Sequence, residues 1–539
     1  MGKASVFMER YYFFGFVILG TIVAGVFALL WLPALILFVI GLGATLLGVW
    51  DLVQTRHSIL RNYPVIGHMR WLFEGIRPEI RQYLIESDED ETPFNREERS
   101  VVYERAKGMP DKTPFGTKLN VYQQNYAWLN HSMLPRHLED HDFRVRIGGP
   151  DCKKPYDLSL YNISAMSFGA LSANAIHALN EGAKRGGFAH DTGEGGISRY
   201  HKAGGGDLIY EIGSGYFGCR DENGKFSPES FQEQAALDQV KMIEIKISQG
   251  AKPGHGGVLP AAKITEEIAE ARHVPMDEDC VSPAAHSAFS TPLELAQFIG
   301  ELRELSGGKP VGFKLCIGRR HEFMAVVKAM LATGIVPDFI VVDGKEGGTG
   351  AAPLEFTDNM GTPLIDGLRF VHNTLVGAGL RDRIRIGASG KIITAFDILR
   401  TCAMGADWCN SARGFMFAIG CVQARSCHTN RCPTGVATQD PVRQRALVVE
   451  DKAARVARFH ENTMRAVAEM VGAAGLSHPE ELSLRHFRIR RQEGKILSGE
   501  EAVIQLPKNC LVNETCTDPE FAVPWQRSSA ETFELRQLA

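Results

Sequence analysis

The chain has 539 residues, of which 44% are hydrophobic and 23% are charged, and these values argue against general disorder. Its formal net charge is −4, and it carries no basic block or basic–aromatic stripe, so no nucleic-acid partner is expected. Its 11 cysteines lack the even spacing of a secreted disulfide scaffold. Composition therefore favours a large enzyme in a reducing compartment.

The first element in chain order is a long apolar stretch over residues 11–53, which contains a single charged residue near its end. One membrane-crossing helix needs about 20 apolar residues, so this stretch is long enough for two. Pro33 interrupts it near the middle, and proline can begin a helix but cannot continue one. The pattern predicts a transmembrane helical hairpin in residues 1–54, with helices of roughly 12–31 and 34–53.

A secretory signal and a buried soluble hairpin are the alternatives for this stretch. A signal peptide has a shorter apolar core and a small-residue cleavage site, and a soluble hairpin rarely contains so long an apolar run. Lys3 and Arg10 precede the stretch, and Arg56, Arg61 and Arg70 follow it. By the positive-inside rule both ends lie in the cytoplasm. We therefore expect a protein of the cytoplasmic membrane whose catalytic domain faces the cytoplasm.

Residues 55–150 carry no catalytic pattern and are interpreted as a linker and capping region. Residues 151–445 alternate short apolar runs with helix-like stretches, which is typical of a parallel sheet in an α/β protein. Eight such runs favour a (β/α)8 TIM barrel over an open doubly wound sheet. The predicted strands are 158–164, 188–191, 243–247, 280–282, 311–316, 339–343, 384–388 and 408–411. An extra pair of short strands, at about 208–212 and 216–219, is interpreted as an insertion, and residues 446–539 as a short helical C-terminal extension.

In such a barrel the chemistry sits at the C-terminal ends of the strands. Glycine-rich segments follow several predicted strands, and those after strands seven and eight include Gly390 and Gly414. Barrels commonly hold a phosphate at this place through backbone N–H groups, and Arg413 can add a charge-assisted contact. The pattern predicts a phosphate-bearing cofactor.

Three cysteines, Cys421, Cys427 and Cys432, lie close together in a C-x₅-C-x₄-C pattern. Zinc sites usually have C-x₂₋₄-C pairs and a fourth ligand nearby. Thiolates close in sequence, with a proline after the last one, resemble iron–sulfur ligation. Spacing alone leaves a three-iron cluster and three buried structural cysteines as alternatives.

The sequence CHTNRCPTGVATQ at 427–439 closely resembles the cluster motif of glutamate synthases. Further segments resemble that family in the same order, at 165–172, 192–196, 250–254 and 347–351. The resemblance, to the short stand-alone members, implies an FMN-binding synthase barrel with a 3Fe-4S cluster on the three cysteines. In this family reduced FMN gives a hydride to the imine of 2-oxoglutarate and ammonia, and the product is L-glutamate.

The resemblance also implies residue roles. Lys252 and Arg272 would hold the substrate carboxylates, and Glu194 would orient the reacting nitrogen or relay a proton, so these three are the expected catalytic residues. The expected FMN contacts are Ala165, Met166, Ser167, Lys314, Asp343, Gly347, Gly348, Thr349, Gly390, Lys391, Ser411, Arg413 and Gly414.

Two loops depart from the family pattern and leave the substrates open. Val258 stands where the family has a glutamine that contacts the oxo acid, and Ser287 and Ala288 stand where it has His-Asp. No strand–G-x-G-x-x-G–helix fingerprint for a dinucleotide is present, so the electrons are expected from ferredoxin or a reductase.

Three functions follow from these observations. The first is a membrane-tethered glutamate synthase that uses ammonia. The second is a related oxidoreductase that acts on another amine and oxo acid, as in the formation of N-methylglutamate. The third is a non-catalytic electron-transfer protein.

Overall fold

The computed structural model describes residues 10–87, 92–259, 261 and 264–536. The described residues fall into two compact units that divide at residue 90. The predicted division into four domains stays a prediction. Each unit is described by itself.

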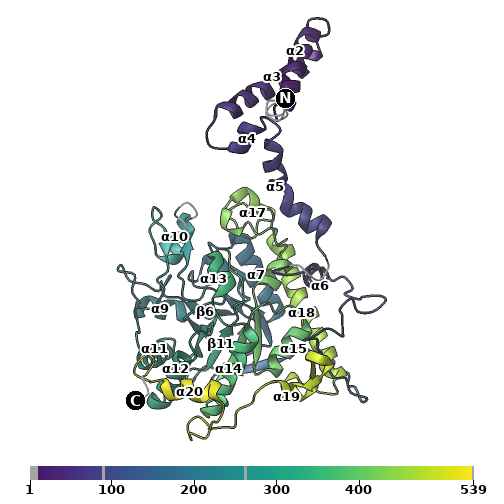
Figure 1. Cartoon of the computed structure of the whole chain (residues 1–539). Helices are drawn as coiled ribbons and strands as arrows, with labels where there is room; N and C mark the ends of the chain where they lie inside the picture. The colour runs from purple at the N-terminus through teal and green to yellow at the C-terminus, as the bar shows by residue number, and fades with distance from the viewer. Residues whose placement is uncertain (1–9, 88–91, 260, 262–263, 537–539) are drawn as a thin grey trace. The chain divides into compact units, whose positions relative to one another are not determined.

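Eight parallel strands close into a barrel within the second unit (Figure 1). This closed barrel confirms the predicted (β/α)8 fold class. In order around the barrel the strands are β4 (Tyr161–Ile163), β5 (His190–Asp191), β6 (Leu208–Ile212), β7 (Val240–Lys246), β10 (Val311–Leu315), β11 (Phe339–Asp343), β12 (Arg385–Ser389) and β13 (Trp408–Ser411).

Three of the strand assignments made from the sequence are wrong. Residues 208–212, interpreted as an insertion, form the barrel strand β6, which pairs with β5 and β7. Residues 280–282, predicted as a barrel strand, instead contribute β9 (Cys280–Val281), which pairs antiparallel with β8 (Val258–Leu259) outside the barrel. Residues 216–219 form turns and not a strand. Short apolar runs do not reveal their partners, which is why the two were exchanged.

Helices connect the strands and cover the outside of the barrel (Figure 1). The helices between barrel strands are α7 (Ala173–Gly186), α8 (Arg199–Gly204), α9 (Pro228–Ala235), α10 (Glu266–Arg272), α11 (Pro292–Leu305), α12 (Arg320–Thr333), α13 (Leu354–Asn359), α14 (Leu364–Gly377) and α15 (Ala395–Ala403). Capping boxes at Thr291 and Thr394 begin α11 and α15, because each hydroxyl accepts a backbone N–H and an acidic side chain returns the bond.

The segments before and after the barrel pack onto it. Helix α18 (Val449–Ala473) contacts α7 and α15, where the very short α16 (Arg413–Ala418) leaves the outer ring open. Helix α6 (Arg96–Lys107) contacts α18, and β1 (Ala127–Leu129) forms a sheet with β14 (Phe487–Arg490) and β15 (Ile496–Ser498). Residues 446–539 thus carry strands as well as helices. The other α-helices described there are α19 (Gly499–Ala502) and α20 (Pro519–Arg527), and α17 (Pro441–Arg445) precedes α18.

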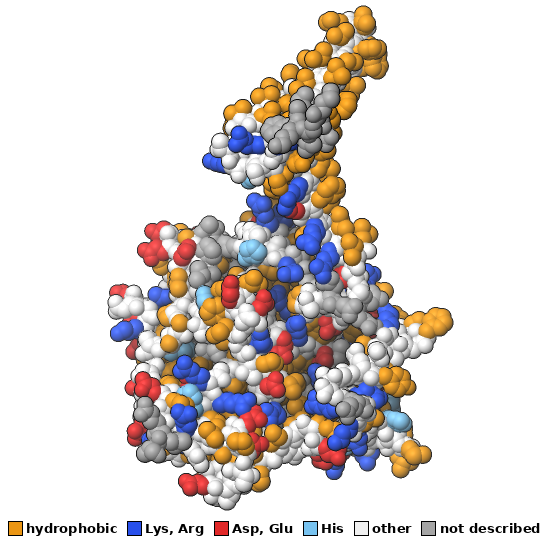
Figure 2. Space-filling model, in the orientation of Figure 1, with side chains coloured by type: hydrophobic (Ala, Val, Ile, Leu, Met, Phe, Trp, Pro, Cys, Tyr) orange, Lys and Arg blue, Asp and Glu red, His pale blue; other side chains and the backbone are white. Residues whose placement is uncertain are grey.

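The first unit consists of four α-helices and one turn of π-helix among its described residues. These are α2 (Tyr12–Ala28), α3 (Ala34–Val53), α4 (Ser58–Asn62), α5 (His68–Ile80) and the π-helical turn Arg81–Ile85. Helices α2 and α3 pack antiparallel, with the hydroxyls of Thr21 and Thr45 3.1 Å apart and no room for a Cβ on Gly48 beside Phe14. Their outward faces are hydrophobic (Figure 2).

Only α3, with 20 residues and 11% burial, is long and apolar enough to cross a membrane among the described helices; α2 is apolar but has 17 residues. A transmembrane hairpin therefore stays a prediction. Lys3, used for its orientation, lies outside the described residues.

A buried ion pair ties two barrel strands together at their N-terminal ends. The Asp338 carboxylate accepts hydrogen bonds from the guanidinium of Arg303 (Nη2 at 3.1 Å) and from the backbone N–H groups of Val311 and Gly149. Both charged side chains are less than 10% exposed. These contacts fix the entry into β10 and β11.

Replacing Asp338 by alanine should therefore leave a buried, unpaired guanidinium and two N–H groups without acceptors. We expect the free energy of unfolding to fall by about 3–5 kcal/mol, measured by urea-induced unfolding. Asp382→Ala is the control, because its ion pair with Lys508 is solvent-exposed and worth about 0–1 kcal/mol. Equal effects of the two substitutions would contradict this account.

Candidate functional site

Two adjoining hollows open at the carboxyl ends of the barrel strands. The inner pocket is lined by Phe94, Ser164, Ala165, Gln249, Ala251, Lys314, Asp343, Glu346, Gly347, Gly348, Ser389, Gly390, Lys391, Asn410, Ser411, Ala412 and Arg413. The outer cavity, of about 420 Å³, shares Ala165 and Arg413 with it and extends over Glu194, Lys252 and Arg272. The barrel thus brings the predicted cofactor and catalytic residues to one end.

The structure places almost all of the expected FMN contacts around these hollows. Ala165, Lys314, Asp343, Gly347, Gly348, Gly390, Lys391, Ser411 and Arg413 line the inner pocket, and Met166, Ser167 and Thr349 line the outer cavity. Gly414 lines neither hollow. Its backbone N–H donates to Ser411 Oγ at 3.3 Å, so it supports the pocket wall from behind.

One end of the inner pocket is suited to a phosphate. The backbone N–H groups of Gly390, Lys391 and Arg413 form no hydrogen bond within the described part of the chain. Arg413 Nη2 donates to the carbonyl of Thr349 at 2.8 Å, and a Cβ on Gly348 would lie 2.8 Å from that nitrogen. A side chain at position 348 would displace the guanidinium from this place. Free N–H donors beside a guanidinium form a site for an anion.

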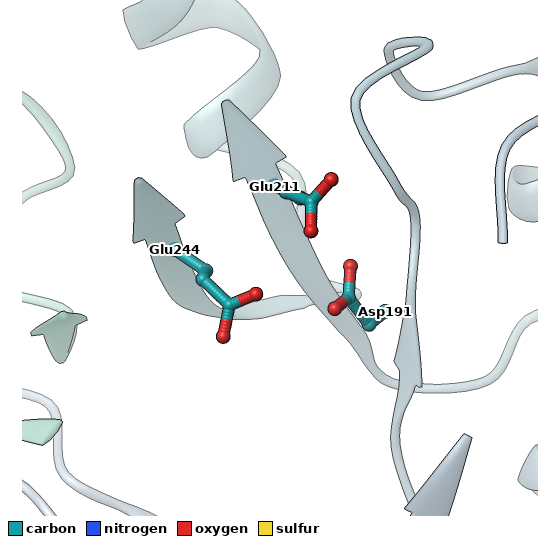
Figure 3. Close-up of side chains that lie close together, drawn as sticks. All are labelled: Asp191, Glu211 and Glu244. Carbon is teal, nitrogen blue, oxygen red and sulfur yellow. The ribbon is translucent and has the colours of Figure 1, made fainter. Parts of the chain in front are cut away.

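The floor of the hollows is a buried charge cluster inside the barrel. Lys314 on β10 forms ion pairs with Glu211 on β6, with Glu244 on β7 (3.1 Å) and with Asp191 on β5 (3.6 Å). The three carboxyl groups point toward one another (Figure 3). We did not predict these acidic residues as site residues, although a charge inside an apolar run of a barrel strand is a signal that the sequence contains.

The outer cavity surrounds one carboxylate with cations. Glu194 Oε2 lies 3.1 Å from Lys246 Nζ and accepts a hydrogen bond from Ser282 Oγ at 3.4 Å. Burial alone raises the pKa of Glu194. The ammonium of Lys246 and, more weakly, the charges of Arg272 and Lys252 outweigh burial and lower that pKa. Glu194 is therefore ionised at neutral pH, and the three cations leave an excess of positive charge for an anionic ligand.

Arg272 and Lys252 are both buried, at 6% and 8% exposure. The Arg272 guanidinium donates to the carbonyl of Phe168 at 3.2 Å and lies over the Phe217 ring, while its buried Nε has no hydrogen-bond partner. Burial lowers the pKa of Lys252. Lys246 was missed from the sequence, because only the barrel shows that the end of β7 reaches the same cavity as α10.

The two loops that differ from the family pattern lie at different places relative to the outer cavity. The side chain of Val258 lies outside the described residues, while Ser282 lines the outer cavity. His286 lies close to the hydroxyl of Tyr216 (3.1 Å) and the backbone carbonyl of Lys246 (2.9 Å), and burial lowers its pKa to about 4. It is therefore neutral, and it supports the strand that carries Lys246 and does not line the cavity.

The three cysteines follow α16 in one loop beside the outer cavity. Cys421 and Cys432 are buried, and Cys427 lines the cavity. Burial raises the pKa of Cys421 to about 11, and the neighbouring Cys427 and Cys432 oppose its ionisation further. For Cys432 burial also acts to raise the pKa, but the backbone N–H of Ala437 and further hydrogen bonds outweigh it and lower the pKa.

The spacing of these sulfurs bears on the kind of metal group. Among the described residues, the one trio of possible ligands whose atoms lie within 4.8 Å of one another is Asp191, Glu211 and Glu244. Within the described part of the chain the three cysteine sulfurs do not all lie within that distance of one another.

Residues 130–477 match the family described as the conserved region in glutamate synthase. The chain belongs to the glutamate synthase family. The glutamate synthase large subunit-like protein YerD of Bacillus subtilis (strain 168) is 38% identical over 88% of this chain and 98% of that protein. The archaeal glutamate synthase (NADPH) of Methanocaldococcus jannaschii is 36% identical over 61% of each chain, so this chain spans under two thirds of that relative. The family membership inferred from the cysteine motif is confirmed.

Among solved structures, a mutant flavocytochrome b2 with pyruvate bound is similar with a TM-score of 0.43 and 13% identity. The likeness covers 83% of this chain and 91% of that protein.

Proposed function

We propose that this glutamate synthase family member is an FMN- and 3Fe-4S-dependent oxidoreductase that reduces the imine of 2-oxoglutarate and ammonia to L-glutamate. The observation that carries this proposal is the excess of positive charge in the outer cavity, where Lys246, Lys252 and Arg272 surround Glu194. A dicarboxylate supplies the two negative charges that balance three cations and one carboxylate. A neutral substrate would leave buried cations unpaired, which is costly.

The inner pocket would hold FMN, with its phosphate on the free N–H groups of Gly390, Lys391 and Arg413. When bound, FMN supplies two-electron hydride chemistry. The chain's own groups orient the substrate. Lys252 and Arg272 bind its carboxylates, and Glu194, held by Lys246 and Ser282, accepts a hydrogen bond from the reacting nitrogen.

Cys421, Cys427 and Cys432 would hold the iron–sulfur cluster, because they lie near one another in one loop and thiolates are the ligands of such clusters. Cys427 lies in the wall of the outer cavity, so a cluster there is close to the flavin site. Its role is to pass electrons from ferredoxin or a reductase.

We expect the purified protein to contain iron, and Cys427→Ser to remove the paramagnetic signal of the cluster while FMN stays bound. Electron paramagnetic resonance, iron analysis and flavin absorbance measure the three quantities. Cys516→Ser is the matched control, since Cys516 is a partly buried cysteine far along the chain from the loop. About one zinc per chain without iron would overturn the cluster.

The substrate assignment is tested at Arg272. Charge-assisted hydrogen bonds contribute roughly 1.5–3 kcal/mol each, so Arg272→Ala should weaken 2-oxoglutarate binding about ten- to a hundredfold. FMN should stay bound because its site lies at the other hollow. Reoxidation of the anaerobically reduced enzyme by 2-oxoglutarate with ammonium measures the effect. Arg199→Ala is the control, since Arg199 is solvent-exposed and pairs with Glu267.

A second candidate function is the reduction of another imine, such as one formed from an oxo acid and methylamine. Val258, Ser287 and Ala288, which replace polar residues of the family pattern, favour it. A wild-type enzyme that ignores 2-oxoglutarate with ammonium but is reoxidised with methylamine or another oxo acid would establish this function instead. Reoxidation by a quinone alone would favour the electron-transfer protein.

We further propose that α2 and α3 cross the cytoplasmic membrane as a hairpin and hold the catalytic unit on its cytoplasmic face. Support comes from the apolar α3, from the hydrophobic outward faces of both helices and from Arg56 and Arg61 just beyond them.

Deletion of residues 1–54 should release a flavin-loaded enzyme into the soluble fraction, because the barrel core lies entirely in the second unit. Cell fractionation with and without detergent measures the change. If the full-length protein is soluble without detergent, the membrane proposal fails.

A further inference from the structure

The buried cluster at the floor of the hollows has more acidic groups than its single cation can balance. Asp191, Glu211 and Glu244 are each 1% exposed, and their carboxyl groups lie together (Figure 3). Their carboxyl oxygens lie within 4.8 Å of one another, and Lys314 forms ion pairs with all three. Full ionisation would place three negative charges against one positive charge in the dry interior of a barrel. Uncompensated charge is costly there, so such groups retain protons.

Hydrogen bonding points the same way. Both carboxyl oxygens of Glu244 are buried, and neither accepts a hydrogen bond, although Oε1 lies 3.1 Å from Lys314 Nζ. Glu244 and Lys314 therefore form an ion pair whose geometry is not that of a hydrogen bond. A proton on Glu244 turns an acceptor without a donor into a donor toward Asp191, which lies within reach.

The pKa directions agree with this geometry. Burial raises the pKa of Glu244 well above its ordinary value, and Lys314 opposes the rise. Burial likewise raises the pKa of Asp191 to about 7, with Lys314 acting against it and Glu211 adding to it. The shift favours the protonated form of Glu244, and the pKa of Asp191 lies near neutral pH.

A metal ion is not the occupant of this trio. The ammonium of Lys314 already lies between the carboxyl groups and contacts all three. A divalent cation at the same place would be repelled by it.

The cluster touches both hollows, since Lys314 lines the inner pocket and Glu211 lines the outer cavity. We propose that Asp191, Glu211 and Glu244 form a proton-binding site that takes up one proton when the flavin is reduced and returns it during substrate reduction. This inference rests on the proposed binding of FMN in the inner pocket.

Charge and protons balance in this exchange. An external one-electron donor such as ferredoxin supplies two electrons, which with one proton convert FMN into its anionic reduced form. A second proton goes to the cluster of Asp191, Glu211 and Glu244, so the total charge of the flavin and these acids is unchanged. When two electrons and the flavin's proton leave as hydride for the imine carbon, the cluster's proton goes to the imine nitrogen, and amine and oxidised FMN result.

The groups that face the cluster come from five neighbouring strands. Besides the three acids and Lys314, Asp343 on β11 acts on Lys314 and accepts a hydrogen bond from the backbone N–H of Gly250 at 2.7 Å. Burial raises the pKa of Asp343 as well. Asp191 also accepts a backbone hydrogen bond, from the N–H of Gly193 at 3.0 Å. Asp191 differs from Asp343 because its carboxyl oxygen lies within 4.8 Å of those of Glu211 and Glu244, and it is therefore the group that exchanges the proton.

The experiment measures the midpoint potential of bound FMN against pH by anaerobic dithionite titration of the full-length holoenzyme. Each proton taken up with two electrons changes the reduction equilibrium tenfold per pH unit, or about 30 mV. Above about pH 7, and as long as the flavin is oxidised, the three acidic residues lack the second proton. The wild type should therefore change about a hundredfold per pH unit between pH 7.5 and 9, and Asp191→Asn about tenfold. Glu301→Gln, on the exposed face of α11, should match the wild type.

Infrared difference spectroscopy of the wild type gives a second measurement, which decides the matter if Asp191→Asn does not fold. Reduction should increase the carbonyl absorption of protonated carboxyl groups, and exchange into deuterium oxide should shift this absorption. Equal slopes in wild type and Asp191→Asn, or no carboxyl change on reduction, would overturn the proton site. Neither reading needs an oxo acid, so such a result with bound FMN leaves the proposed substrate standing. Absence of FMN would instead overturn the proposed function.

Discussion

Closure of eight parallel strands is the constraint on which the site depends. Because every barrel strand runs in the same direction, residues that are far apart in sequence, such as Glu194, Lys246 and Arg413, arrive at one end. The opposite end is fixed by the buried Asp338–Arg303 pair, which holds the start of β10 and β11. Stability and chemistry are therefore located at different ends of the same strands.

The charges within this barrel are divided by sign between two levels. The outer cavity has an excess of cations around Glu194, and the interior beneath it has an excess of acids around Lys314. In the proposed reaction an anionic substrate neutralises the upper level, and protons neutralise the lower one. Each level therefore carries unbalanced charge until its counter-charge binds. This arrangement favours an anionic substrate that is also protonated during the proposed reaction.

Sequence patterns revealed the features that are local and missed those that need the fold. The cysteine triplet and the glycine-rich strand ends lie within short segments, so spacing alone could identify them. The charge cluster could not be found in this way, since Asp191, Glu211 and Glu244 come from three strands. Strand β6 was misassigned because its apolar run, which includes Glu211, looked like part of a separate hairpin. Long-range pairing decides such elements.

The contrast between Glu194 and Glu244 shows how one protein assigns opposite roles to the same side chain. Glu244 is buried and Glu194 is partly buried, and burial acts to raise the pKa of each. Three cations around Glu194 overcome burial, so it is ionised, and in the proposed reaction it accepts a hydrogen bond from the reacting nitrogen. Glu244 shares one cation with two other acids, so its protonated form is favoured and it can donate a hydrogen bond. The number of nearby cations, and not the residue type, therefore decides which carboxyl group accepts a hydrogen bond and which belongs to the proposed proton-binding site.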